Sequence, residues 1–244
     1  LDLSVITAET LSAVNPVLPR PAHRGQDSFI VAPTAHTHLG GISINALTET
    51  ELQGLYAAGE VAGGVHGANR LGGNALSEVL VFGRLAGDQA ARFAASHEPP
   101  RAHGDIPAQE CARLSALLGS QEKGVKGLRK ELKRTMWQKA GVVRDGSSIE
   151  DALLRIAELR RSLDQERAPG GRELQHLIKT HNLFTTAELV CLSARARTES
   201  RGAHFRTDFP VENDIEWLQT IVLRKDTDGV RLSREPVGLP YLRP

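Results

Sequence analysis

The chain has 244 residues, with 30 Lys and Arg against 29 Asp and Glu and a formal net charge of +1. This balance argues against a protein that binds nucleic acid through a broadly basic surface. Aromatic residues make up only 4%, which argues against a stacking platform for single strands. With 40% hydrophobic and 24% charged residues, the composition is typical of a globular protein of one or two domains.

Cys111 and Cys191 lie far apart, which predicts neither a disulfide framework nor a cysteine metal site. Reduced thiols favour a cytoplasmic location. No apolar run reaches the roughly 20 residues that span a bilayer. The first residue is Leu1 rather than Met, so we expect the chain to be part of a longer polypeptide.

The first part of the chain, residues 1–98, has the pattern of an α/β domain. Prolines at 16, 19 and 21 predict an extended connector over residues 1–28. Apolar runs predict short strands at 29–32, 42–44 and 54–58. A glycine-rich loop then leads from Gly63 to Gly73 into residues 75–95, whose nearly all-round apolarity predicts a buried helix.

After the prolines at 99 and 100, helical patterns dominate. We expect helices opening at Pro107, around residues 128–137, from an N-cap at 147–148 to residue 163, and from 173 to 198. Together they predict an antiparallel bundle of three or four helices over residues 99–204. The tail, residues 205–244, has only short strand-like pieces such as 221–223.

The glycine-rich region carries the residues most suited to ligand chemistry. A strand ending in Gly59 and Glu60 can present a carboxylate to a sugar or ribityl hydroxyl. The following helix begins near Asn74, where free N–H groups can face an anionic or electron-rich group. Arg70 can bind a carboxylate through two parallel hydrogen bonds. Glycines used only for packing and a surface arginine are the structural alternatives, and neither G-x-G-x-x-G nor a phosphate loop occurs.

A second cluster contains His36 and His38, one residue apart. No Asp, Glu or Cys cluster completes a metal site around them, so we expect no metal. Donors that face a substrate fit this pair better than metal ligands do.

Four segments in order resemble the flavoprotein subunits of succinate dehydrogenase and fumarate reductase. Residues 33–42 resemble that family's P-T-A-H-Y-T-M-G-G-I, and residues 54–87 resemble G-L-Y-A-x-G-E, H-G-A-N-R-L-G-x-N-S-L and V-F-G-R-x-A-G. Residues 136–144 resemble M-W-x-x-x-G-V-x-R, and residues 197–210 resemble the A-R-x-E-S-R-G-A-H-Y-R-x-D-x-P segment. L-aspartate oxidases share this architecture. The resemblance implies α/β plus all-α structure, with the C-terminal part of a FAD-binding domain followed by a helical bundle.

The resemblance also implies FAD as cofactor and hydride transfer between flavin N5 and a dicarboxylate, interconverting succinate and fumarate. His36 and Arg70 then bind substrate carboxylates, and His38, where the family has Thr, is a further candidate. The residues implied at the cofactor are Gly59, Glu60, Asn74, Ala75 and Leu76. No catalytic residue is implied in this part of the family's sequence.

Two alternatives remain open: an L-aspartate oxidase, and a non-catalytic half completed by a separate FAD-binding chain. Without the pyrophosphate fingerprint, we expect the chain alone to bind FAD weakly and not to turn over. The resemblance also implies a possible iron–sulfur partner and a peripheral location on the inner face of a membrane. No nucleic-acid partner is expected. In the last motif, ion pairs that dock the tail on the flavin domain are favoured over catalysis; the residues are Arg197, Glu199, Arg201, Arg206 and Asp208.

Overall fold

The computed structural model describes residues 35–98, 104–120, 124–227 and 229–238. The chain divides into two compact units, Leu1–Thr37 and His38–Pro244. The connector predicted at 1–28 and the strand predicted at 29–32 lie outside the described residues.

The strands predicted at 42–44 and 54–58 are reduced to isolated bridges. Ile42 pairs with Ala62 in parallel, and Glu49 pairs with Tyr56 in antiparallel fashion. The chain segments approach closely here, because a Cβ atom at position 41 would lie 2.2 Å from the Val61 carbonyl oxygen. A longer ladder needs further neighbouring strands, and the described residues around these bridges supply none.

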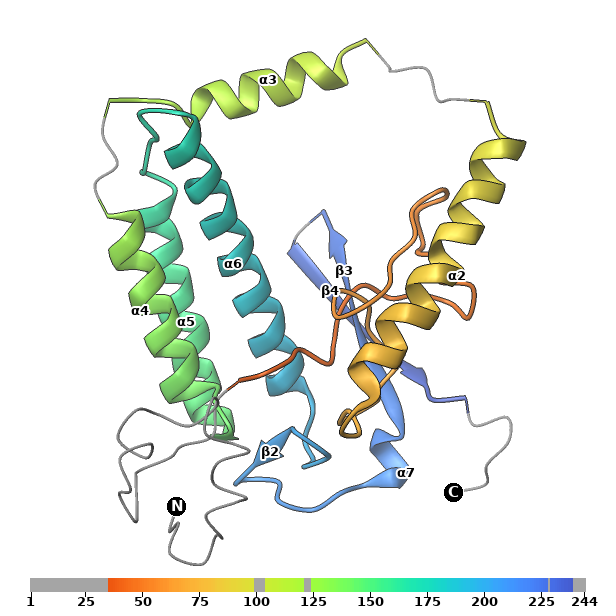
Figure 1. The fold of residues 1–244 in the computed structure, drawn as a ribbon. Helices are drawn as coiled ribbons and strands as arrows, with labels where there is room; N and C mark the ends of the chain where they lie inside the picture. Colours follow the sequence, from red (N-terminus) through yellow and green to blue (C-terminus); the bar gives the residue numbers. More distant parts are fainter. Residues whose placement is uncertain (1–34, 99–103, 121–123, 228, 239–244) are drawn as a thin grey trace, which may run out of the picture. The chain divides into compact units, whose positions relative to one another are not determined.

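Helix α2, Asn74–Ser96, confirms the predicted helix but not its burial. Leu76 and Leu80 are 67% and 65% exposed, and Glu78 is the only buried residue of the helix. The apolar pattern correctly predicted helical structure. Among the described helices and strands, however, none packs extensively against α2 (Figure 1).

The bundle consists of three helices that lie side by side: α4, Val125–Lys139; α5, Gly146–Leu163; and α6, Gly171–Ala196 (Figure 1). Helix α3, Ile106–Ala116, has proline in its first turn as predicted, but it buries no residue and adds nothing to the bundle core. The core is built from residues at helical spacing: Val125, Leu132, Ile149, Ala152, Ile156, Leu159, Leu163, Leu177, Phe184, Ala187, Cys191 and Ala194.

The start of α5 differs from the predicted cap at 147–148. Asp145 is the N-cap and accepts a hydrogen bond from the Ser148 N–H at 2.9 Å. The Ser148 hydroxyl accepts one from the Asp145 N–H at 3.1 Å, which completes a capping box. The hydroxyl of Ser147 and the N–H of Ser148 donate to Asp145, and these bonds lower the pKa of its carboxyl.

The C-terminal region contains more regular structure than predicted. Strand β1, Val143–Arg144, pairs in parallel with β2, Phe205–Arg206. Strands β3, Gln219–Asp226, and β4, Gly229–Pro236, form an antiparallel hairpin of eight residues each, which extends well beyond the expected piece at 221–223.

A buried tryptophan anchors this hairpin. Helix α7, Asp214–Trp217, ends in Trp217, which is 1% exposed. The guanidinium groups of Arg234 and Arg197 lie 3.8 Å and 4.9 Å from the centroid of its ring. The hairpin is therefore fixed to the end of the bundle by cation–π contacts as well as by burial.

Candidate functional site

The loop that follows the two histidines is fixed by Glu60. Its Oε1 accepts a hydrogen bond from the His38 N–H at 2.8 Å, which joins positions 22 residues apart. The His38 ring is bonded within its own loop, with Nδ1 2.7 Å from the Gly40 carbonyl oxygen. Glu60 is exposed, and its second oxygen makes no other hydrogen bond to the described residues. A carboxylate oxygen therefore stays free to accept a hydroxyl donor.

The N-terminus of α2 is open. Gly73, the N-cap, has a left-handed φ of 85° and makes no side-chain cap, and the first turn carries no acidic residue. No described atom lies within 4 Å of a Cβ position at Gly72 or Gly73. The positive end of the helix dipole is thus accessible to an electron-rich group.

Arg70 lies in the loop that leads into this helix. It is partly buried, and its Nε is buried without a hydrogen-bond partner among the described residues. A buried donor that stays unpaired costs about 1–3 kcal/mol, and more when it is charged. A bound carboxylate would remove this cost by pairing with the guanidinium in a planar, bidentate arrangement.

The predicted site residues fall into both compact units. His36 is exposed and belongs to the unit Leu1–Thr37. The others lie in the unit His38–Pro244: His38 itself, Gly59 and Glu60 before the glycine-rich loop, Arg70 within it, and Asn74, Ala75 and Leu76 at the start of α2. Their roles in binding substrate or cofactor stay predictions.

Sequence reasoning missed a pair of residues that joins the glycine-rich loop to α2. The Nε2 of His66 lies 3.5 Å from the Oε2 of Glu78, and these side chains are 16% and 8% exposed. The available signal was Glu78 itself, because it is the single charged residue in the apolar stretch 75–82. A buried acid on an otherwise apolar helix favours a nearby polar group, and the His66 ring lies beside it. The His66 Nε2 makes no hydrogen bond to the described residues.

Comparison with known proteins shows which flavoproteins the chain resembles. Residues 129–244 match the family described as fumarate reductase flavoprotein C-term, and residues 11–76 match the FAD binding domain family. The chain is 42% identical over 208 residues to a fumarate reductase (CoM/CoB) subunit of Methanothermobacter marburgensis, covering 84% of this chain and 38% of that protein. Its structure resembles that of E. coli quinol fumarate reductase FrdA, with a TM-score of 0.89, 32% identity and coverage of 100% of this chain and 45% of that one.

Both matched regions therefore make the chain similar to flavoproteins of the succinate dehydrogenase/fumarate reductase family. L-aspartate oxidase of Synechocystis is also similar, at 33% identity over 261 residues, covering 97% of this chain and 45% of that protein. The chain therefore spans less than half the length of these relatives. The matches confirm the predicted architecture of a FAD-binding domain followed by a helical C-terminal domain.

The family's last motif forms a buried ion-pair cluster, as predicted. Glu199 is fully buried and accepts hydrogen bonds from Arg201 Nε and Nη2, both at 2.9 Å, and from Arg197 at 2.5 Å. The Asn213 N–H donates a further bond at 2.9 Å. Burial alone would raise the pKa of Glu199, but these donors outweigh burial and the pKa is lowered.

The other predicted pair lies at the end of α6. Arg206 binds Asp208 and also donates to the carbonyl oxygen of Arg195 at 2.8 Å, which satisfies the C-terminus of the helix. Further along the tail, the Arg224 side chain donates to Glu51 at 2.9 Å. The boundaries at 98 and 204 and the docking of the tail as a separate domain stay predictions.

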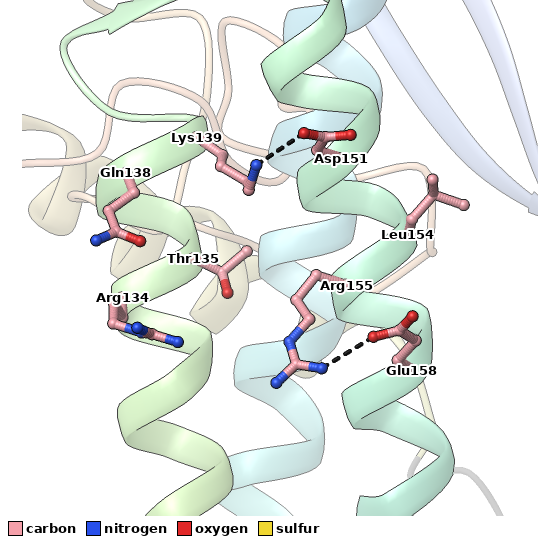
Figure 2. A pocket seen from close by; sticks show the side chains of 8 residues that line it. All are labelled: Arg134, Thr135, Gln138, Lys139, Asp151, Leu154, Arg155 and Glu158. Carbon is pink, nitrogen blue, oxygen red and sulfur yellow. Dashed lines mark hydrogen bonds and ion pairs between the residues drawn. The ribbon is translucent and has the colours of Figure 1, made fainter.

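A surface hollow between α4 and α5 is lined by charged side chains that pair with one another. Figure 2 shows this hollow, in which Lys139 binds Asp151 at 2.8 Å and Arg155 binds Glu158 at 2.9 Å. Because these charges pair with one another, the hollow is a solvated helix surface. Among the described residues, no group of three His, Cys, Asp or Glu side chains could hold a metal ion. None of the described helices is long and apolar enough to cross a membrane.

Proposed function

We propose that the chain is the substrate-binding and flavin-binding part of a FAD-dependent enzyme that interconverts succinate and fumarate by hydride transfer. The observation that carries this proposal is the buried, unpaired Nε of Arg70 in a loop that opens onto the N-terminus of α2. A dicarboxylate supplies the acceptor that this arginine lacks. The family supports the reaction class, since two relatives named fumarate reductase are 42% and 31% identical to this chain.

The residues present fit FAD. Glu60 keeps a free carboxylate oxygen, the first turn of α2 lacks a side-chain cap, and Gly72 and Gly73 leave open space beside it. When bound, FAD supplies the flavin ring that exchanges a hydride with the central carbons of the dicarboxylate. In this proposal, Glu60 accepts from a cofactor hydroxyl.

The remaining predicted residues divide between cofactor and substrate. The backbone at Gly59 and from Asn74 to Leu76 would help to hold the flavin, and the open N-terminus of α2 would stabilise negative charge on it. Arg70 holds one substrate carboxylate. The roles of His36 as a donor to a substrate carboxylate, and of His38 as its replacement or assistant, stay predictions from the family resemblance, since His36 belongs to the unit Leu1–Thr37.

L-aspartate oxidase is the second candidate, since the Synechocystis enzyme of that name is similar over 97% of this chain. A chain completed by a separate FAD-binding polypeptide is the third, and co-purification of that polypeptide would support it. We also propose an iron–sulfur partner and a peripheral location on the inner face of the membrane.

The test is a comparison of fumarate and L-aspartate turnover by the full-length flavoprotein and its Arg70→Ala variant. Charge-assisted hydrogen bonds contribute about 1.5–3 kcal/mol, so we expect kcat/KM for fumarate to fall roughly 10- to 150-fold in the variant. Arg84→Ala is the matched control, because Arg84 is 86% exposed on α2 and we expect no change there. Turnover of aspartate without fumarate reduction would favour the oxidase, and an unchanged kcat/KM in Arg70→Ala would overturn the role of Arg70.

A further inference from the structure

The loop that carries Arg70 is pressed against a tight turn from the C-terminal region. Gly202 has a left-handed φ of 55°, and a Cβ atom there would lie 2.4 Å from the carbonyl oxygen of Ala68. The neighbouring Ala203 N–H donates to that same oxygen at 3.0 Å. One backbone hydrogen bond and the close approach of Gly202 therefore fix the position of Ala68, which lies two residues before Arg70.

The turn that makes these contacts is itself held firmly. The Arg201 N–H donates to the His204 carbonyl at 2.8 Å, and the His204 N–H donates back to the Arg201 carbonyl at 2.9 Å. The Arg201 side chain is bound by the fully buried Glu199 through two hydrogen bonds of 2.9 Å. A buried ion pair thus sets the place of the turn, and the turn sets the place of Ala68.

The same loop also lies close to α2 on the N-terminal side of Ala68. His66 lies against Glu78 of α2, at 3.5 Å. Because Arg70 follows Ala68 by two residues, a displacement at Ala68 passes on to it. Arg70 has no side-chain partner of its own among the described residues to resist that displacement.

We propose that Gly202 is a positioning residue for Arg70, and that the turn from Arg201 to His204 sets the affinity of the site for a dicarboxylate without touching it. This inference rests on the proposed function of Arg70. An alanine at 202 must move the Ala68 oxygen about 1 Å to restore ordinary van der Waals contact. Displacement of a positioning group by about 1 Å can cost on the order of 100-fold.

The test measures the Kd of malonate, an unreactive dicarboxylate, from the change it causes in the flavin spectrum of the full-length FAD-loaded protein. The variants are Gly202→Ala, Arg70→Ala and the double variant. Gly229→Ala is the matched control, because Gly229 also has a positive φ, 133°, in the β3–β4 hairpin and has open space around it. Bound FAD and the thermal midpoint are recorded for every variant.

We expect Gly202→Ala to weaken malonate binding 10-fold or more and to raise KM for fumarate, with no such change in Gly229→Ala. In the Arg70→Ala background, Gly202→Ala should add little, because a residue that acts through Arg70 loses its effect when Arg70 is absent. Additive losses, or a lowered thermal midpoint with unchanged malonate affinity, would overturn the inference.

A separate outcome identifies failure of the proposed function. If Arg70→Ala itself leaves malonate affinity unchanged, the role of Arg70 is wrong, and the inference fails with it. If Arg70→Ala weakens binding while Gly202→Ala does not, only the inference fails. Should Gly202→Ala fail to retain FAD, Arg201→Lys is measured in its place, since it keeps the charge beside Glu199 but loses the paired hydrogen bonds. It should weaken malonate binding, again only when Arg70 is present.

Discussion

Replacing Glu199 by Gln should destabilise the C-terminal region strongly. Glu199 is fully buried, and its carboxylate accepts four hydrogen bonds, from Arg197, Arg201 and the Asn213 N–H. The amide would turn an N–H₂ group toward these donors and leave two arginines, 17% and 20% exposed, without a counter-charge. Breaking a buried ion pair by removing one partner costs about 3–5 kcal/mol.

The assay is the thermal midpoint of the full-length protein. For a unit of this size a loss of 1 kcal/mol shifts the midpoint by roughly 2–4 °C, so we expect a fall of about 6–20 °C. Glu188→Gln is the matched control, because Glu188 is 42% exposed and binds Arg160 at 2.9 Å on the surface. Such exposed pairs contribute about 0–1 kcal/mol. Equal shifts in the two variants would refute the reasoning that burial makes the Glu199 cluster important.

Three further predictions concern the pH dependence, a thiol and a helix cap. Burial, together with the nearby charge of Arg144, lowers the pKa of His204 to about 4. Because the unfolded state binds this proton with a pKa of about 6.5, stability should fall as the pH drops from about 6.5 to 4, and the thermal midpoint of His204→Gln should depend less on pH over that window. Burial raises the pKa of Cys191 to about 11, whereas Cys111 is exposed, so iodoacetamide at neutral pH should label Cys111 alone, as read by mass spectrometry. Asp145→Ala should cost about 1 kcal/mol in urea unfolding through loss of the α5 cap, and an unchanged midpoint would contradict that role.

The bundle was predictable from sequence because its helices bury a periodic apolar face. Ile149, Ile156 and Leu163 recur at helical spacing and are at most 1% exposed. The exposure of α2 was not predictable from sequence. An apolar pattern shows that a helix surface is suited to burial, but it does not show which element covers that surface. The prediction of a strand at 42–44 was wrong for a related reason. A high β propensity of the residues does not supply the neighbouring strands with which a ladder forms.

The residue types of the candidate site were predictable from sequence. The long-range contacts that position these residues were not. Glycines before a helix and an arginine among them predicted ligand chemistry from local sequence. The contact of Gly202 with Ala68 joins residues far apart in the chain, and no spacing rule reveals it. The same holds for the hydrogen bond from the His38 N–H to Glu60.

Fumarate reduction with Arg70 as a substrate ligand is tested most directly by reoxidation of the reduced flavin with fumarate. The reaction is followed in a stopped-flow instrument with the full-length protein. We expect rapid, saturable reoxidation by fumarate, and a half-saturating fumarate concentration raised roughly 10- to 150-fold in Arg70→Ala. Reoxidation that does not depend on fumarate, or that is identical in Arg70→Ala, would contradict this expectation.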